Sequence, residues 1–354
     1  MRFIHIADVH LGASPEAGRA YSGNRGREIW DTFQQVLEVC ECEKTDVLLI
    51  AGDLFHRQPL LRELKEVDYM FSKLTHTSVV LIAGNHDYIK ENSYYGSFVW
   101  SENVYPIFSE CIDCIEIEAL ELAVYGCSYH QKEVKKERLQ QDIQLVGQKY
   151  HILLGHGGDA THMPFEINQM KQLQYDYIAL GHIHKPQIMI EDKMAYAGAL
   201  EPSDIADYGC HGYILGEIKL ANRNETRIKF VEFASREYKE IKIDVHTEMT
   251  HYRLKDEIRE EQEKYGVRHM YHVELQGVRT PEVLFDLEDL FAMGNIVAIE
   301  DYTILDYDLQ KLEKKNRENL LGAYIRSFGE VEEGSIEYMA LYEGVRAIEE
   351  TKKG

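Results

Sequence analysis

The sequence predicts a layered α/β protein, and three observations lead to this prediction. Five short runs rich in β-branched residues end in polar clusters, at 3–8, 46–53, 78–87, 150–158 and 176–184. Helix-like amphipathic stretches separate the first three runs. The 354 residues, of which 44% are hydrophobic and 28% charged, suffice for an ordinary core and about two domains. Strands that alternate with helices in this way pack as layers.

The helical stretches of this first part have apolar residues on one face. Residues 27–44 carry them at 29, 30, 33, 36, 37 and 40, and residues 60–74 repeat the spacing. A single apolar face is typical of helices that cover a sheet. The five strand-like runs are instead apolar almost throughout, which is the pattern of strands buried on both faces.

The character of the sequence changes near residue 236, where a smaller unit begins. Strand-like and helix-like patterns alternate over 237–245, 249–265, 270–277, 281–293 and 295–304. Two amphipathic helices are expected to follow, at 307–328 and 335–350, joined by a glycine-containing turn. We therefore predict three parts: 1–235, 236–305 and 306–354.

Charge and cysteine content limit the classes of function. The formal net charge of -22 argues against a protein coated in basic nucleic-acid-binding surface. Cys111 and Cys114 form a CxxC pair without a second pair nearby, so small buried side chains are favoured over a zinc site. The chain opens directly on "MRFIHIADVHLG", and no apolar run approaches 18 residues. We expect a reducing, cytoplasmic location and no membrane association.

Each predicted strand ends in side chains that metal ions favour. They are Asp8 and His10, Asp53 and His56, Asn85 with His86 and Asp87, His156, and finally His182 and His184. Ligands bind outside the carboxyl ends of strands in open α/β sheets, so a shared sheet edge would bring these residues together. A glycine precedes four of the clusters, which fits a backbone that passes close to an ion or a phosphate: Gly52, Gly84, Gly155 and Gly181.

The ligand types favour one kind of chemistry. Carboxylate, imidazole and amide oxygen suit Mn, Fe, Zn or Ni. A central carboxylate can bridge two cations about 3.5–4 Å apart, and such a pair clamps both oxygens of an in-line phosphoryl displacement and generates a hydroxide nucleophile. An unligated histidine is then free to act as an acid. A single strand-end histidine is more often a surface or hydrogen-bonded residue, but five such ends together favour a metal centre.

The order of these motifs resembles a known family. D-x-H (8–10), GD (52–53), GNHD (84–87), GH (155–156) and GHIH (181–184) are similar to the motifs of the calcineurin-like metallophosphoesterases. The versions "DVHLG", "AGDLFH" and "LGHIHKPQ" resemble the SbcD-type DNA repair nucleases and, among them, a YhaO-like branch. The resemblance covers roughly residues 1–215. It implies a two-sheet sandwich flanked by helices, a small α/β capping domain and C-terminal helices that dock an SbcC-type ATPase.

The resemblance also implies a ligand set for two divalent ions. Asp53 would bridge the pair, and the ions would be Mn first, with Fe, Zn, Ni or Mg as alternatives. One ion would be held by Asp8, His10 and His184, and the other by Asn85, His156 and His182.

Three further residues receive catalytic roles from the resemblance. His86 would protonate the leaving oxygen or stabilise the phosphate in the transition state, and Asp87 is a candidate for orienting it. His56, in "DLFH", matches a second non-ligand histidine of the nuclease branch, which favours a nuclease over a general phosphoesterase.

Three hypotheses for function remain open at this point. The first is a Mn-dependent DNA exo- and endonuclease of DNA repair that works as a homodimer, by resemblance. The second is a phosphodiesterase or phosphatase for nucleotides or phosphoproteins, which the same metal site would support. The third, an idle scaffold, is disfavoured because the ligand set is intact. The chain has no G-x-x-x-x-G-K-[ST] stretch, so ATP-driven action would need a separate subunit.

A DNA enzyme needs basic residues along its phosphate track, which makes the acidic balance the main departure from the first hypothesis. The candidates near the motifs are Arg19, Arg25, Arg27, Arg57, Lys90 and Lys185, although a charge in such a position is more often solvated surface than a phosphate contact. Tyr88, Tyr94 and Tyr95 could stack on bases or pack beneath a loop. We expect weak DNA affinity for the chain alone and stronger affinity with its partner.

Overall fold

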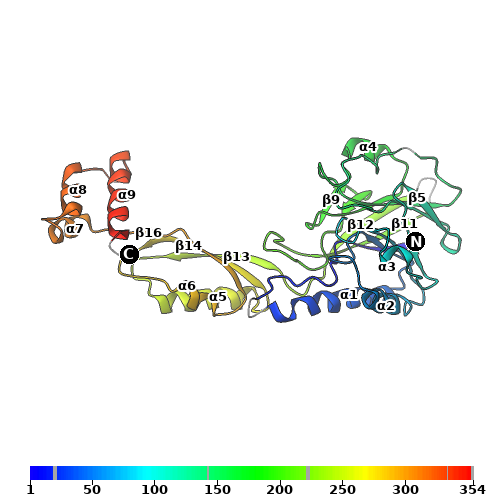
Figure 1. The fold of residues 1–354 in the computed structure, drawn as a ribbon, viewed down its shortest axis with the longest axis horizontal. Coiled ribbons are helices and arrows are strands. Elements are labelled where there is room, and N and C mark those ends of the chain that lie inside the picture. Colours follow the sequence, from blue (N-terminus) through cyan, green and yellow to red (C-terminus); the bar gives the residue numbers. More distant parts are fainter. Residues whose placement is uncertain (19–21, 142, 221–223, 333, 352–354) are drawn as a thin grey trace. The chain divides into compact units, whose positions relative to one another are not determined.

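The computed structural model describes residues 1–18, 22–141, 143–220, 224–332 and 334–351. The chain folds into two compact units (Figure 1). The first is Met1–Lys239 together with Arg268–Met270, and the second is Glu240–Val267 together with Tyr271–Gly354. The predicted layered α/β class is confirmed, because the first unit stacks two mixed sheets between helices.

One six-stranded sheet has the order β12-β11-β1-β2-β3-β4. Its strands β1 to β4 are parallel, whereas β11 and β12 are antiparallel additions at one edge. The strand bounds are β1 Arg2–Ile6, β2 Val47–Ala51, β3 Ser78–Ile82, β4 Val104–Pro106, β11 Gly212–Lys219 and β12 Glu225–Glu232.

The other six-stranded sheet has the order β5-β6-β7-β8-β10-β9. Here β6, β7, β8 and β10 are parallel, and the edge strands β5 and β9 are antiparallel to their neighbours. The strand bounds are β5 Asp113–Ile117, β6 Leu122–Gly126, β7 Tyr150–His156, β8 Tyr177–Gly181, β9 Gln187–Ile190 and β10 Met194–Tyr196.

Alternation of side chains along the strands builds the layers. Along β2, Val47 and Leu49 belong to the core between the two sheets, and Leu48 and Ile50 belong to the core beneath the helices. Successive strand residues point to opposite faces, so a strand between two packed layers must be apolar throughout. This arrangement explains why β2 is buried at every position.

Helices cover the outer face of each sheet. The helices α1 (Arg25–Cys42) and α2 (Leu61–Phe71) pack on the first sheet through Phe33 and Val67, among others. The short helix α4 (Ile167–Gln172) lies on the opposite side of this unit, where Met170 joins the core of the second sheet (Figure 1). The remaining short turns are η1 Ser22–Asn24, α3 Tyr94–Ser97 and η2 Glu118–Leu120.

The second unit has its own sheet and core. Its sheet has the order β13-β14-β15, and β16 also pairs with β14. The helix α5 packs Leu254 and Ile258 into an apolar core with the sheet residues Ile243 and Val273. The bounds are β13 Tyr238–Val245, β14 Met270–Arg279, β15 Ile296–Asp301, β16 Ile304–Leu305, α5 His251–Tyr265 and α6 Leu287–Phe291.

The C-terminal segment forms three helices where two were predicted. They are α7 Leu309–Lys315, α8 Leu320–Phe328 and α9 Ile336–Glu350. The expected single helix over 307–328 is interrupted because the Asn319 side chain accepts hydrogen bonds from Leu321 N and Gly322 N, which starts a new helix there. The helix predicted over 281–293 is likewise limited to α6, which begins after the capping Asp286. Of the helices described, none has the length and apolar character needed to cross a membrane.

Candidate metal centre

The predicted ligand residues come together, but at the edge of two sheets rather than one. Asp8, Asp53 and Asn85 follow β1, β2 and β3 of the first sheet. His156 ends β7, and His182 follows β8, in the facing sheet. The expectation of a single sheet edge is therefore wrong. Carboxyl ends of parallel strands from both layers meet at one site.

The first group of donors consists of Asp8, His10 and His184. One ligand atom from each lies within 4.8 Å of the others. His10 Nε2 is 3.1 Å from His184 Nε2, so the two rings turn these nitrogens toward a common point. Asp8 and His10 are 1% and 2% exposed. The group therefore encloses a small polar space that could hold one cation.

The second group consists of Asn85, His156 and His182. Asn85 Oδ1 lies 2.9 Å from His156 Nε2 and 3.2 Å from His182 Nδ1. The other ring nitrogen of His156, Nδ1, donates to Ala51 O at 2.9 Å. That bond leaves His156 Nε2 to face the site, because a neutral imidazole carries a single N–H.

Asp53 lies between the two groups. Its Oδ2 atom is 3.4 Å from His156 Nε2, in the second group, and 4.0 Å from His10 Nε2, in the first. Its other oxygen, Oδ1, accepts a hydrogen bond from His86 N at 2.8 Å. The carboxylate is only 2% exposed, and its position suits a ligand shared by two ions.

The backbone at the site adopts unusual conformations. Asp8, His10, Asp53 and His182 have φ values of 49°, 52°, 50° and 94°, in the left-handed region that non-glycine residues seldom occupy. Such conformations cost about 1–3 kcal/mol each and concentrate at functional sites. Here they turn the side chains back over the strand ends.

Two of the predicted glycines make the close packing possible. A Cβ atom on Gly52 would lie 2.4 Å from His156 Nδ1, and one on Gly84 would lie 2.2 Å from Asp53 Oδ1. Any larger residue would displace these donors. Gly181 serves the approach of the two sheets, because its Cβ would meet Ala51 O at 2.1 Å.

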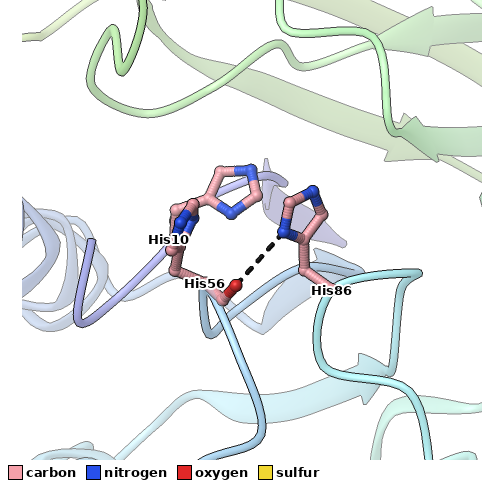
Figure 2. A group of neighbouring side chains, drawn as sticks. All are labelled: His10, His56 and His86. Carbon is pink, nitrogen blue, oxygen red and sulfur yellow. Dashed lines mark hydrogen bonds between the residues drawn. The ribbon is translucent and has the colours of Figure 1, made fainter. Parts of the chain in front are cut away.

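Three histidines form a group at the mouth of the site (Figure 2). The ring of His86 lies 4.8 Å from that of His10 and 5.3 Å from that of His56, measured between centroids. His86 Nδ1 donates to the main-chain oxygen of His56 at 3.1 Å, as the dashed line in Figure 2 shows. This bond leaves His86 Nε2 available, and the ring is only partly buried.

Asp87 is fully buried and serves the backbone around it. Its carboxylate accepts hydrogen bonds from Gly84 N at 2.7 Å and from Phe55 N at 3.1 Å. Burial, together with the charge of Asp53, raises the pKa of the Asp87 carboxyl to about 7. These bonds hold the loop that carries His86. An effect of Asp87 on His86 would therefore act through the loop.

The buried carboxylates at the site favour positive charge beside them. Burial lowers the pKa of His156, but the neighbouring Asp53 carboxylate raises it more, to about 9. Burial also lowers the pKa of His184, and Asp207 and Asp8 raise it to about 9. Buried carboxylates thus attract positive charge onto adjacent imidazoles. The donor set of carboxylates, imidazoles and one amide fits divalent metal ions.

Two acidic residues at the site were not predicted from the sequence. Asp159 contacts His182, and Asp207 contacts His184, at hydrogen-bonding distance. Both lie in loops outside the five motifs, so no local pattern distinguishes them from surface carboxylates. His162, whose ring lies beside that of His182, was not predicted as a site residue either. The "GHGGDATH" run around it was the available signal.

The structure excludes or limits several of the basic and aromatic residues that were candidates for contacts with DNA. Arg25 is fully buried, where it donates to Glu28 and to Pro202 O, so it can neither contact a phosphate nor act as a solvated charge. Arg57 pairs with Glu63 at 2.8 Å. Tyr95 is buried and packs in the core, which rules out stacking on a base. Arg19 lies outside the described residues.

The chain is similar to known phosphoesterases. A family model described as Calcineurin-like phosphoesterase matches residues 1–186. The DNA double-strand break repair protein Mre11 of Methanocaldococcus jannaschii is 27% identical over 260 residues, which is 69% of this chain and 69% of that protein. Mre11 of Sulfurisphaera tokodaii is 28% identical over 309 residues, 79% of this chain and 75% of that protein. The uncharacterized metallophosphoesterase YhaO of Bacillus subtilis is 30% identical over 237 residues, 61% of this chain and 57% of its length.

Proposed function

The chain belongs to the calcineurin-like phosphoesterases, and from this premise we propose that it is a dinuclear-metal phosphodiesterase that cleaves DNA. The observation that carries the proposal is the convergence of six donor side chains around the buried Asp53 carboxylate, all seven coming from five strand ends. The similarity to two proteins named for DNA double-strand break repair supports DNA as the substrate.

Asp53 would be the shared ligand of the two ions. Asp8, His10 and His184 would complete one position, and Asn85, His156 and His182 the other. When bound, a metal pair supplies an activated water as the nucleophile and neutralises the charge on the phosphate. Manganese is the proposed ion, because mixed oxygen and nitrogen donors without thiolates suit it.

His86 would serve the leaving group. Its Nδ1–H is committed to the His56 main-chain oxygen, so in the doubly protonated ring the Nε2–H is the group that would pass a proton to the departing oxygen. A partly exposed ring at the mouth of the site suits this role, because the leaving strand must reach it. His56 lies beside it and would contact the nucleic acid, and Asp87 would keep the loop of His86 in place.

The second unit would bring the substrate and the partner. We propose that residues 236–305 act as a capping domain that selects how DNA enters, and that residues 306–354 dock an SbcC-type ATPase. The exposed apolar side chains of the C-terminal helices support docking, since Leu320, Ile336 and Met339 are 73%, 77% and 54% exposed. A homodimer is proposed for the assembly on the basis of the family resemblance.

The test compares four substrates in the presence of Mn²⁺. Single-stranded DNA, double-stranded DNA, bis-p-nitrophenyl phosphate and a phosphomonoester are each incubated with the full chain and with Asp53→Asn. We expect cleavage of DNA and of the diester by the wild type alone. Cleavage of the monoester without DNA cleavage would instead favour a nucleotide or phosphoprotein phosphatase, and no cleavage of any substrate would favour a scaffold.

A further inference from the structure

The two histidines of "GHIH" contact carboxylates through opposite ring nitrogens. His182 Nε2 lies 2.7 Å from Asp159 Oδ2, while its Nδ1 faces Asn85 Oδ1 at 3.2 Å. His184 is reversed, with Nδ1 3.1 Å from Asp207 Oδ2 and Nε2 facing His10 Nε2 at 3.1 Å. Each ring therefore has one nitrogen on a carboxylate and the other directed into the metal centre.

The carboxylates determine which nitrogen carries the proton. An ionised carboxylate can only accept hydrogen bonds, and a neutral imidazole has a single N–H. A ring that binds a metal ion is neutral, so its N–H must then lie on the side of the carboxylate, and the lone pair lies on the opposite nitrogen. Asp159 would leave the lone pair of His182 on Nδ1, and Asp207 would leave that of His184 on Nε2.

We propose that Asp159 and Asp207 are positioning residues that set opposite tautomers in the two histidines, so that His182 binds its ion through Nδ1 and His184 through Nε2. The inference deepens the proposed function and rests on its metal centre. Partners of this kind orient ligand imidazoles and raise their basicity in many metal sites.

Asp159 is itself held in place by its loop. Its Oδ1 atom accepts hydrogen bonds from Thr161 N at 2.7 Å and from His162 N at 3.0 Å, and its Oδ2 atom also contacts His162 Nδ1 at 2.8 Å. The His162 ring lies 4.4 Å from that of His182, between centroids. Gly157 allows the backbone to pass this close to His162, because a Cβ atom at Gly157 would lie 2.2 Å from His162 O.

Asp207 is anchored from a different segment. Its Oδ2 atom accepts hydrogen bonds from Ser203 N at 2.9 Å and Asp204 N at 3.1 Å, in addition to the contact with His184. Its side chain is 9% exposed, against 43% for Asp159. Because water screens the more exposed carboxylate, Asp207 should have the larger effect on its ion.

The test replaces each carboxylate by the isosteric amide in the full chain. An asparagine side chain can donate as well as accept, so it no longer requires the ring N–H on its side. Since loss of such partners costs about 10–100-fold in metal affinity, we expect about 100-fold for Asp207→Asn and about tenfold for Asp159→Asn. Calorimetric titration of the metal-free protein with Mn²⁺ alone should show one of two binding steps weakened in each variant. Asp159→Glu should restore part of the affinity.

Asp113→Asn is the matched control, because Asp113 is an exposed carboxylate at the start of β5 that accepts a hydrogen bond from the adjacent Cys114 N at 2.8 Å. It should leave both binding steps unchanged. A loss in Asp159→Asn and Asp207→Asn no greater than in the control would overturn the proposal.

A second readout reports the tautomers directly. Nitrogen-15 NMR of histidine-labelled protein loaded with Zn²⁺ should show metal-bound Nδ1 in His182 and metal-bound Nε2 in His184. Coordination of both rings through the same nitrogen would overturn the inference, as would a wild type that binds fewer than two ions. Two bound ions with the expected tautomers, but no DNA cleavage, would instead remove the proposed substrate and support the positioning roles.

Discussion

The buried carboxylates of the candidate metal centre, in the first unit, differ in their ion pairing from two carboxylates of the second unit. In the first unit, Asp8 and Asp53 are 1% and 2% exposed, and no lysine or arginine among the described residues forms an ion pair with either. In the second unit, Glu274 pairs with Lys242 at 2.8 Å, and Asp289 pairs with Lys255 at 2.7 Å. These two carboxylates of the second unit are therefore paired with lysines of the same unit, and Asp289 is still 41% exposed.

The difference distinguishes carboxylates that are paired with lysines from carboxylates that belong to the candidate metal centre. A buried carboxylate that lacks a lysine or arginine partner is costly unless another group compensates its charge, as the adjacent imidazoles do here and as a bound cation would. The paired, exposed carboxylates of the second unit require no such addition and contribute little to stability. Burial beside several imidazoles, rather than the number of acidic residues, distinguishes the candidate metal centre.

The largest effect is expected from Asp53→Asn. A neutral amide lacks the negative charge with which the carboxylate would bridge two cations. Binding of both ions should therefore be weakened or lost, and with it the nucleophile that they would provide. Turnover of bis-p-nitrophenyl phosphate should fall by more than about 10⁴-fold. Metal content after gel filtration, measured by elemental analysis, checks the cause. Retention of two ions would show that Asp53 is not a bridge and would remove the main support for the comparison.

His86→Gln should affect catalysis without affecting the ions. If His86 acts as the acid, turnover should drop by about 10²–10⁴-fold, while metal content stays near that of the wild type. Steady-state kinetics with elemental analysis of the same samples makes the measurement. Equal loss of metal and activity would reassign His86 as a ligand, and a drop smaller than about tenfold would exclude the acid role.

Leu341→Ala should affect the second unit alone. Leu341 is 2% exposed in the apolar core of the C-terminal helices, so the substitution should reduce local stability by about 2–5 kcal/mol. Hydrogen exchange should accelerate across α8 and α9, while hydrolysis of bis-p-nitrophenyl phosphate stays unchanged. Tyr338→Ala, at a partly exposed position of α9, serves as the milder control. Lower activity in Leu341→Ala would show that the two regions are energetically coupled.

The smallest effect is expected on stability, when the ions are removed from the intact wild type. Mn²⁺ at about 100 times its dissociation constant should add about 2.7 kcal/mol to the stability of the unit that binds it. Chelation should then lower its melting temperature by about 5–10 °C. Hydrogen exchange should localise the change to the strand ends of the first unit. An equal change in the second unit would mean that its paired carboxylates also bind the ion.

Much of the first unit could be predicted from its sequence because burial on both faces leaves a clear pattern. The five predicted strands correspond to β1, β2, β3, β7 and β8. Their polar ends were visible because a carboxylate or imidazole directly after an apolar run is unusual. The edge strands β9 and β12 were not predicted, since strands with one solvated face lack the continuous apolar run.

Contacts that depend on packing between the layers or on loop conformation could not be predicted. The meeting of two sheets at the site depends on packing between layers, and the contacts of Asp159 and Asp207 depend on loop conformation. The split between α7 and α8 follows from one side chain, Asn319, whose capping role competes with a helical pattern that continues past it. The roles assigned to the individual ligands and to His86, His56 and Asp87 remain predictions.

The left-handed backbone at Asp8, His10, Asp53 and His182 has a consequence for how this protein could change. The strain is present whether or not the enzyme works, and flexible substitutes such as glycine would relieve it at once. Selection or engineering for thermostability alone would therefore tend to accept replacements at these four positions first. The resulting protein would be more stable but inactive. Screens for thermostable variants of this chain should therefore measure turnover in every round.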